Sequence, residues 1–84
     1  MKPVTIYTSA TCGFCYRAKM LLEDKGASYD EISVDGQPDV RRDMMARAGQ
    51  HTVPQIWIGE QHVGGCTDLY AMEHAGQLDA LLQS

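Results

Sequence analysis

The chain has 84 residues, 44% of them hydrophobic, and a formal net charge of −4. This length provides one small domain, and the ordinary apolar content argues against disorder. The acidic balance argues against a nucleic-acid partner, because phosphate binding favours a basic surface. No apolar run approaches the roughly 20 residues of a membrane span, and no signal-peptide pattern precedes the first strand-like segment. We therefore expect one domain over residues 1–84 that binds neither nucleic acid nor membrane.

Residues 3–8 are rich in β-branched and aromatic side chains and predict a strand. The hydroxyl of Thr11 is suited to cap the next segment, residues 12–25, whose apolar positions recur at helical spacing. Gly26 is suited to end that helix. Residues 28–34 predict a second strand. Because the joints are short, a right-handed βαβ unit with a parallel strand pair follows.

A second helix is expected to begin near Pro38 and to stop at Gly49. Its inward-facing residues are expected to be Val40, Met44, Met45 and Ala48. Residues 55–58 and 61–63 predict a hairpin, and residues 67–75 predict a helix. A last short helix carries Leu78, Leu81 and Leu82 on one stripe. The order of elements predicts an α/β fold with a four-stranded mixed sheet.

Three cysteines, Cys12, Cys15 and Cys66, are too few, and odd in number, for the disulfide framework of a secreted domain. A reducing compartment, the cytoplasm, fits them better. A zinc site requires four ligands, and neither a second C-x-x-C nor a paired histidine motif supplies them. We therefore expect no metal from this spacing.

The pair Cys12 and Cys15 lies between a predicted strand and a predicted helix. At a helix N-terminus, free backbone N–H groups and the helix dipole favour negative charge, so we expect Cys12 to be the thiolate nucleophile. Cys15 follows one turn later and is placed to resolve a mixed disulfide. The alternative is a chance pair of packed thiols. A C-x-x-C beside a βαβ pattern favours the redox interpretation.

Two further segments carry ligand-binding potential. In Thr52-Val53-Pro54, a cis peptide bond would expose the Val53 backbone to an extended thiol substrate, but base rates for X–Pro bonds favour trans. In residues 64–68, two glycines allow close approach of a ligand to a helix start, whose N–H groups suit a carboxylate, with Asp68 beside it for an ammonium group. The alternative for this segment is a bulge followed by a helix cap.

With these three motifs in order along nearly its whole length, the chain resembles a glutaredoxin of the small bacterial dithiol kind. The resemblance implies a thioredoxin-like fold of order β-α-β-α-β-β-α, a cis Pro54, and glutathione as reductant. It implies that Val53 pairs its backbone with the cysteinyl part of glutathione, while Thr67, Asp68 and the Cys66 backbone hold the γ-glutamyl end. The residues it assigns to glutathione binding are Phe14, Thr52, Val53, Pro54, Gly65, Cys66, Thr67 and Asp68.

Two positions depart from the family pattern. Gly13-Phe14 stands where many dithiol members have Pro-Tyr, and a small residue there is found in iron–sulfur members. The alternative function is therefore a carrier in which Cys12 and glutathione hold a [2Fe-2S] cluster between two chains. Thr8 stands where a lysine often contacts glutathione, and Arg41 or Arg42 either supplies that charge or lies on a solvated helix face.

Cys66 is expected to be a small packed residue beside the ligand groove, the alternative being a second thiol activated at a helix start. Taken together, the sequence predicts a monomeric, glutathione-dependent thiol–disulfide oxidoreductase. Its partners are glutathione and proteins that carry disulfides or glutathione mixed disulfides.

Overall fold

The computed structural model describes residues 1–83. Its elements are β1 (Val4–Thr8), α1 (Gly13–Asp24), β2 (Tyr29–Ser33), α2 (Pro38–Ala48), β3 (Gln55–Ile58), β4 (Gln61–Gly64), α3 (Cys66–His74) and α4 (Leu78–Gln83). The expected order of elements is confirmed, including the predicted short last helix, which is α4. Within the described residues, no helix has the length and apolar character needed to cross a membrane.

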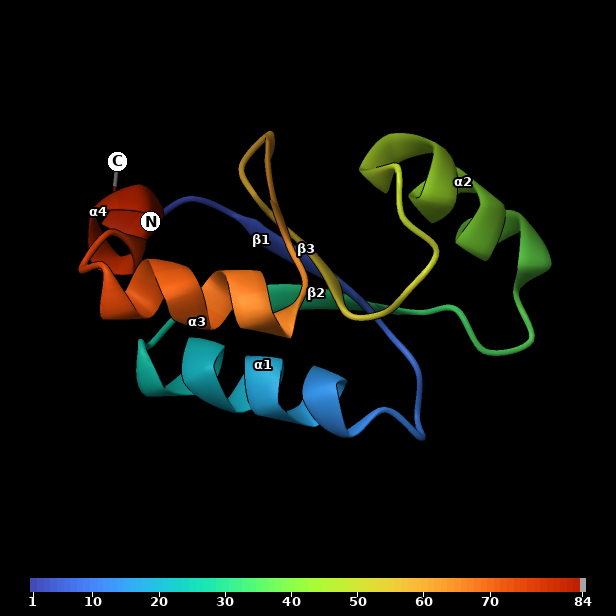
Figure 1. Ribbon diagram of the computed structural model, residues 1–84, viewed down its shortest axis with the longest axis horizontal. Coiled ribbons are helices and arrows are strands. Elements are labelled where there is room, and N and C mark those ends of the chain that lie inside the picture. The colour runs from blue at the N-terminus through green and yellow to red at the C-terminus, as the bar shows by residue number, and fades with distance from the viewer. Residues whose placement is uncertain (84) are drawn as a thin grey trace.

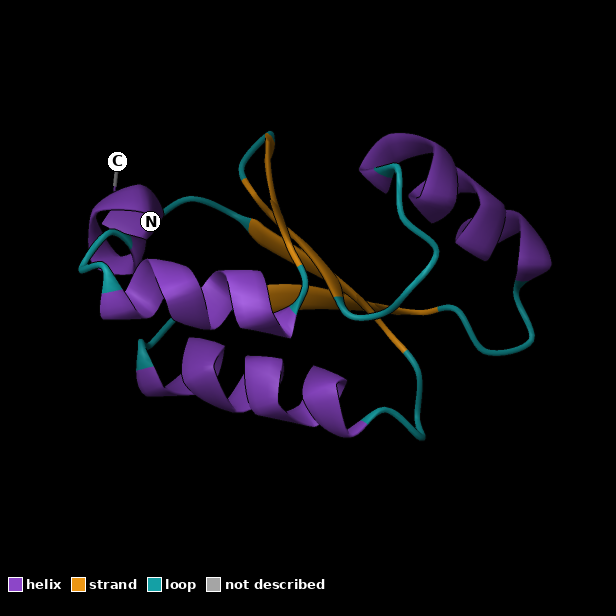
Figure 2. Ribbon diagram, in the orientation of Figure 1, coloured by secondary structure: helices purple, strands orange, loops and turns teal. Residues whose placement is uncertain are grey.

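The four strands form one mixed sheet in the order β2-β1-β3-β4 (Figure 1). The β1–β2 pair is parallel, whereas β1–β3 and β3–β4 are antiparallel. Helices α1 and α3 lie on one side of the sheet and α2 lies on the other (Figure 2). This is the mixed sheet flanked by helices that the sequence predicts, and it is a thioredoxin-like arrangement.

The larger core lies between the sheet and the helices α1, α3 and α4. Ile6 and Ile56 point to this side from the two central strands, and Leu22 and Leu69 meet them from α1 and α3. All four side chains have 0% of their surface exposed. Because side chains alternate along a strand, the neighbouring residues of β1 and β3 point to the other face. The central strands are therefore covered on both faces.

The smaller core lies under α2. Met44, fully buried, packs there with Tyr7, Val34 and Trp57. The expectation that Met45 also points inward is wrong, since 40% of its surface is exposed. One residue along a helix turns the side chain by about 100°, so a narrow contact face admits Met44 and excludes its neighbour.

The start of α1 differs from the expected start in a way that matters for the site. The helix begins at Gly13, and Cys12 is the N-cap residue in place of Thr11. The side chain of Cys12 accepts a hydrogen bond from the backbone N–H of Cys15. The N-cap side chain is therefore a thiol in place of the expected hydroxyl, and a backbone N–H of the first helical turn donates to its sulfur.

Candidate functional site

The sulfur of Cys12 lies where three segments of the chain meet. Its Sγ accepts the N–H of Cys15 at 3.1 Å, and the thiol donates to the carbonyl oxygen of Val53 at 3.5 Å. Cys12 is partly exposed, and all three cysteines are free thiols. A partly exposed sulfur at the N-terminus of a helix is placed to attack a disulfide from solvent.

Cys15 has the opposite environment. Only 1% of its surface is exposed. Burial, followed by the hydrogen bond with Cys12, raises the pKa of the Cys15 thiol from 9.0 to about 12. Cys15 is therefore a thiol at neutral pH. The two sulfurs of the motif differ in access and in ionisation, which is the asymmetry that a nucleophile and a resolving residue require.

The loop before Cys12 is tied to the loop after β2. Asp35 accepts the backbone N–H of Ala10 at 2.8 Å and the hydroxyl of Ser9 at 2.7 Å. These bonds, with the Ala10 N–H first, lower the pKa of the Asp35 carboxyl. The backbone N–H of Cys12 in turn donates to the Ser9 carbonyl at 3.2 Å. The position of the first sulfur is thus set by this loop as well as by α1.

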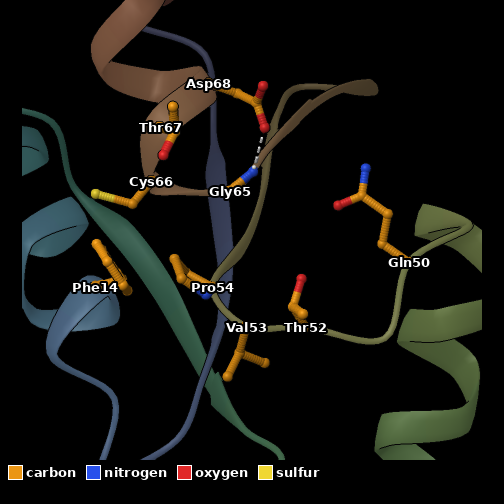
Figure 3. Close-up of a pocket in the computed structure, with 9 residues that line it drawn as sticks. All are labelled: Phe14, Gln50, Thr52, Val53, Pro54, Gly65, Cys66, Thr67 and Asp68. Atoms are coloured by element: carbon orange, nitrogen blue, oxygen red, sulfur yellow. Dashed lines mark hydrogen bonds between the residues drawn. The ribbon is translucent and has the colours of Figure 1, made fainter.

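The peptide bond between Val53 and Pro54 is cis, as the resemblance implied. Val53 and Pro54 both line a pocket of about 300 Å³. Figure 3 shows the nine residues that line the pocket, which are Phe14, Gln50, Thr52, Val53, Pro54, Gly65, Cys66, Thr67 and Asp68. Every residue that the resemblance assigned to glutathione binding is in this set. The structure therefore brings three motifs that are far apart in the sequence to one cavity beside Cys12.

One wall of the pocket is the start of α3. The carboxylate of Asp68 accepts the backbone N–H of Gly65 at 2.9 Å. Gly64 has a φ of +117°, and a side chain there would collide with the Asp68 carboxylate. The glycine is required by this close approach, which brings the carboxylate beside the open N-terminus of α3. The site thus offers N–H donors for an anion and a carboxylate for a cation side by side.

Phe14 also lines the pocket, on the same side as Cys66 and Thr67 (Figure 3), and 58% of its surface is exposed. The guanidinium of Arg17 lies 6.0 Å from the centre of this ring and 5.7 Å from that of Tyr70. This exposed aromatic ring lies two residues along the chain from Cys12 and is available to contact a substrate.

Cys66 lines the pocket but is buried, with 6% of its surface exposed. Burial raises the pKa of its thiol. The alternative of a second activated thiol is therefore wrong, and the expectation of a small packed residue is confirmed. The helix starts at Cys66 itself, so its side chain turns into the core beneath the open N–H groups.

Thr8 and the two arginines are not in the pocket lining. Thr8 is 2% exposed, and its hydroxyl donates to Glu31 at 2.7 Å. Arg41 donates to the backbone carbonyl of His51 at 3.3 Å. Arg42 pairs with Asp39 on the exposed surface of α2. For Arg42 the structure supports the solvated helix face, while Arg41 braces the loop that carries Thr52.

Sequence reasoning missed Gln50, which lines the pocket, and Gln55, which lies behind it. Gln50 falls in a polar loop, where a glutamine carries no signal. The only signal for Gln55 was a polar residue at the start of an otherwise apolar strand. Neither the burial of Gln55 nor its partners could be deduced from that.

Among residues 1–83, no three His, Cys, Asp or Glu side chains gather to form a metal site.

Known proteins are similar to this chain in sequence and in fold. A sequence model of the glutaredoxin family matches residues 4–63. The chain is 58% identical over 84 residues to a glutaredoxin of Pseudomonas aeruginosa, with 100% of both chains covered. It is 52% identical over 83 residues to glutaredoxin 3 of Escherichia coli K12, with 99% of this chain and 100% of that one covered.

Solved structures agree. A buckwheat glutaredoxin in complex with glutathione superposes with a TM-score of 0.90 at 32% identity, covering 98% of this chain and 77% of that one. The solution structure of a Brucella melitensis glutaredoxin superposes with a TM-score of 0.87 at 52% identity, covering 98% and 89%. With a family model and close relatives that match most or all of its length, this chain belongs to the glutaredoxin family.

Proposed function

We propose that this chain is a glutathione-dependent thiol–disulfide oxidoreductase that uses Cys12 as nucleophile and Cys15 as resolving thiol. The observation that carries the proposal is the contrast between the two sulfurs. Cys12 is partly exposed and accepts an N–H from the first turn of α1, while Cys15 is buried and protonated. The backbone N–H and the helix dipole stabilise negative charge on the Cys12 sulfur.

In the monothiol route, the Cys12 thiolate attacks the glutathione sulfur of a protein–glutathione disulfide. The Cys12–glutathione disulfide forms, and the protein leaves as a thiolate that takes a proton from water. A second glutathione thiolate then attacks the glutathione sulfur of that adduct. This step returns Cys12 as thiolate and releases glutathione disulfide, so one free glutathione thiol is consumed for each mixed disulfide reduced, and the other half of the glutathione disulfide comes from that mixed disulfide.

In the dithiol route, Cys12 attacks a protein disulfide, and one protein sulfur leaves as a thiolate. Cys15 loses its proton and attacks the Cys12 sulfur. The second protein sulfur leaves, and an intramolecular Cys12–Cys15 disulfide remains. Two glutathione molecules reduce that bond in turn. Both routes require glutathione in excess, so we propose that the protein acts in the reducing cytoplasm.

The pocket supports a specific pose for glutathione. The α-carboxylate of its γ-glutamyl end meets the free N–H groups at the start of α3, and the α-ammonium meets Asp68. The backbone of its cysteinyl residue pairs with Val53, whose carbonyl lies 3.5 Å from the Cys12 sulfur. The buckwheat relative that was solved with glutathione supports the same ligand here.

The test compares two single substitutions. Cys12→Ser is expected to abolish reduction of a glutathionylated peptide in a glutathione-coupled assay. Cys15→Ser is expected to retain that reduction and to lose the dithiol route. If Cys12→Ser keeps most of the turnover, the nucleophile is wrongly assigned. If Cys15→Ser retains full reduction of a protein disulfide at low glutathione, the role of Cys15 is wrong.

A further inference from the structure

A buried amide stands directly behind the pocket. Gln55 is the first residue of β3, follows the cis proline, and has 0% of its surface exposed. Its Nε2 lies 3.0 Å from Oε1 of Gln50 and 3.1 Å from the backbone oxygen of Thr52. Its Oε1 lies 2.8 Å from Nε2 of His62. A buried polar group stays buried when its bonds are satisfied, and every end of this side chain has a partner.

The orientation of the amides in this network follows from one unambiguous group. The backbone oxygen of Thr52 can only accept, so the end of Gln55 that faces it is the –NH2. The other end of Gln55 is therefore the carbonyl oxygen, and the His62 nitrogen facing it carries a hydrogen. By the same logic, the atom of Gln50 that faces the Gln55 –NH2 is its oxygen.

His62 is a fixed anchor for this chain of bonds. Its ring packs on Trp57, with 4.7 Å between the ring centres, and the Arg47 guanidinium lies 4.7 Å from the centre of the Trp57 ring. His62 Nε2 donates both in the neutral tautomer assigned above and in the protonated ring. The link from β4 to Gln55 therefore persists whichever form His62 takes.

The consequence appears at Gln50. This residue lines the pocket, and its oxygen is engaged by Gln55, so the end left for a ligand is its –NH2. In Figure 3, Gln50 and Thr52 lie on one side of the pocket, and Cys66, Thr67 and Phe14 lie on the other. Asp68 suits an ammonium group, whereas a fixed –NH2 donor suits a carboxylate.

We propose that Gln55 and His62 are positioning residues that hold Gln50 as an N–H donor to the glycyl carboxylate of glutathione. The inference rests on the proposed function, since it assigns one end of the same ligand. It makes Gln50 the specificity-determining residue for that carboxylate, in a chain where the side chain of Thr8 is turned away and bonded to Glu31.

The test uses the rate at which Cys12 is thiolated in the Cys15→Ser background. Two reagents are compared: glutathione disulfide and the disulfide of the glycyl monoethyl ester of glutathione. The ester lacks the charge that Gln50 is proposed to bind. A hydrogen bond to a charged group predicts that the unvaried site reacts about tenfold faster with the acid than with the ester.

Gln50→Glu keeps the shape of the side chain and replaces the donor with a negative oxygen. It is expected to abolish or invert the preference for the acid, which is read as the ratio of the two rates. The matched control is Gln61→Glu, which adds the same charge at an exposed residue of β4 outside the pocket lining. This control is expected to keep the preference.

Gln55→Met tests the positioning role, because it keeps the length of the side chain and removes both hydrogen-bonding ends. It is expected to reduce the acid-to-ester preference, and Gln50→Glu is then expected to have a smaller effect in its presence. His62→Gln, which keeps a donor, is expected to preserve the preference better than His62→Leu. A general loss of stability would slow both reagents equally and would leave the ratio unchanged.

The outcomes separate the two proposals. If Cys12 reacts readily with glutathione disulfide but Gln50→Glu keeps the full acid-to-ester ratio, the inference about Gln50 is wrong and the proposed function stands. If neither reagent thiolates Cys12 in the unvaried site, the proposed function itself fails. Because Gln50 is exposed, this decisive variant does not depend on whether the buried substitution folds.

Discussion

The buried state of Cys15 predicts how the dithiol route depends on pH. With a pKa of about 12, Cys15 is a thiolate in only about one molecule in 10⁵ at pH 7. Part of the shift comes from Cys12, through its hydrogen bond and its charge. Those two causes vanish once Cys12 is held in a mixed disulfide, so the pKa of Cys15 falls. Burial of the sulfur, the largest cause, remains.

The resolving attack therefore draws on a small thiolate fraction throughout the neutral range. Below the pKa of a thiol, this fraction rises tenfold for each pH unit. The rate at which Cys15 displaces glutathione from Cys12 should thus rise about tenfold per pH unit between pH 6 and 8. The monothiol route, in which external glutathione attacks the adduct, does not depend on Cys15.

The measurement starts from the Cys12–glutathione adduct, prepared at low pH and separated from free thiol. After a jump to each pH, acid-quenched samples are analysed by mass for loss of glutathione and formation of the internal disulfide. Cys15→Ser, the matched control, should keep the adduct at every pH. A rate that is flat between pH 6 and 8 would refute the argument, because it would show that Cys15 is already ionised when Cys12 is bonded.

Two further predictions concern the framework. Leu22→Ala removes a fully buried side chain from the larger core and should lower the free energy of unfolding by about 3 kcal/mol in a denaturant titration. Met20→Ala, on the exposed side of the same helix, should change it by less than about 0.5 kcal/mol. The Thr8 hydroxyl, followed by Lys19, lowers the pKa of Glu31 from 4.5, so the ionised carboxylate stabilises the folded state above that value. This stability is lost as the pH falls through the lowered pKa, and the gap in unfolding midpoint between the parent chain and Glu31→Gln should shrink from pH 7 to pH 3. A constant gap would contradict the assignment.

The secondary structure could be predicted from the sequence because each element carries its own local signal. The helical spacing of Cys15, Ala18, Leu21 and Leu22 gave the buried face of α1 correctly. Glycine marked the end of α2 at Gly49, which adopts a left-handed conformation. These patterns involve residues close together in the chain, so they can be recognised in the sequence without knowing the tertiary structure.

Two local predictions failed where contacts from other elements decide. Met45 lies in a helix with the expected spacing, but the contact between α2 and the sheet is too narrow to cover it. Thr11 has good cap chemistry, but the helix starts one residue later and is capped by the Cys12 sulfur. The N-cap preferences of the residue types do not decide between the neighbouring positions Thr11 and Cys12.

The candidate site divides in the same way. The motifs were visible in the sequence, and the resemblance supplied the cis Pro54, which base rates alone opposed. Gln50 and Gln55 were not visible. Their roles depend on the bond between Gln55 and His62, which crosses from β3 to β4, and on the burial of Gln55.

The sequence by itself determined which residues can do redox chemistry and which elements carry them, because thiol spacing and hydrophobic periodicity are properties of a local stretch of chain. Only the tertiary structure decided that one thiol is open and the other sealed, that Thr8 turns toward Glu31, and that a buried amide orients Gln50. These features depend on burial and on hydrogen bonds between segments that are remote in the sequence. Both are established only when the sheet and the helices pack together.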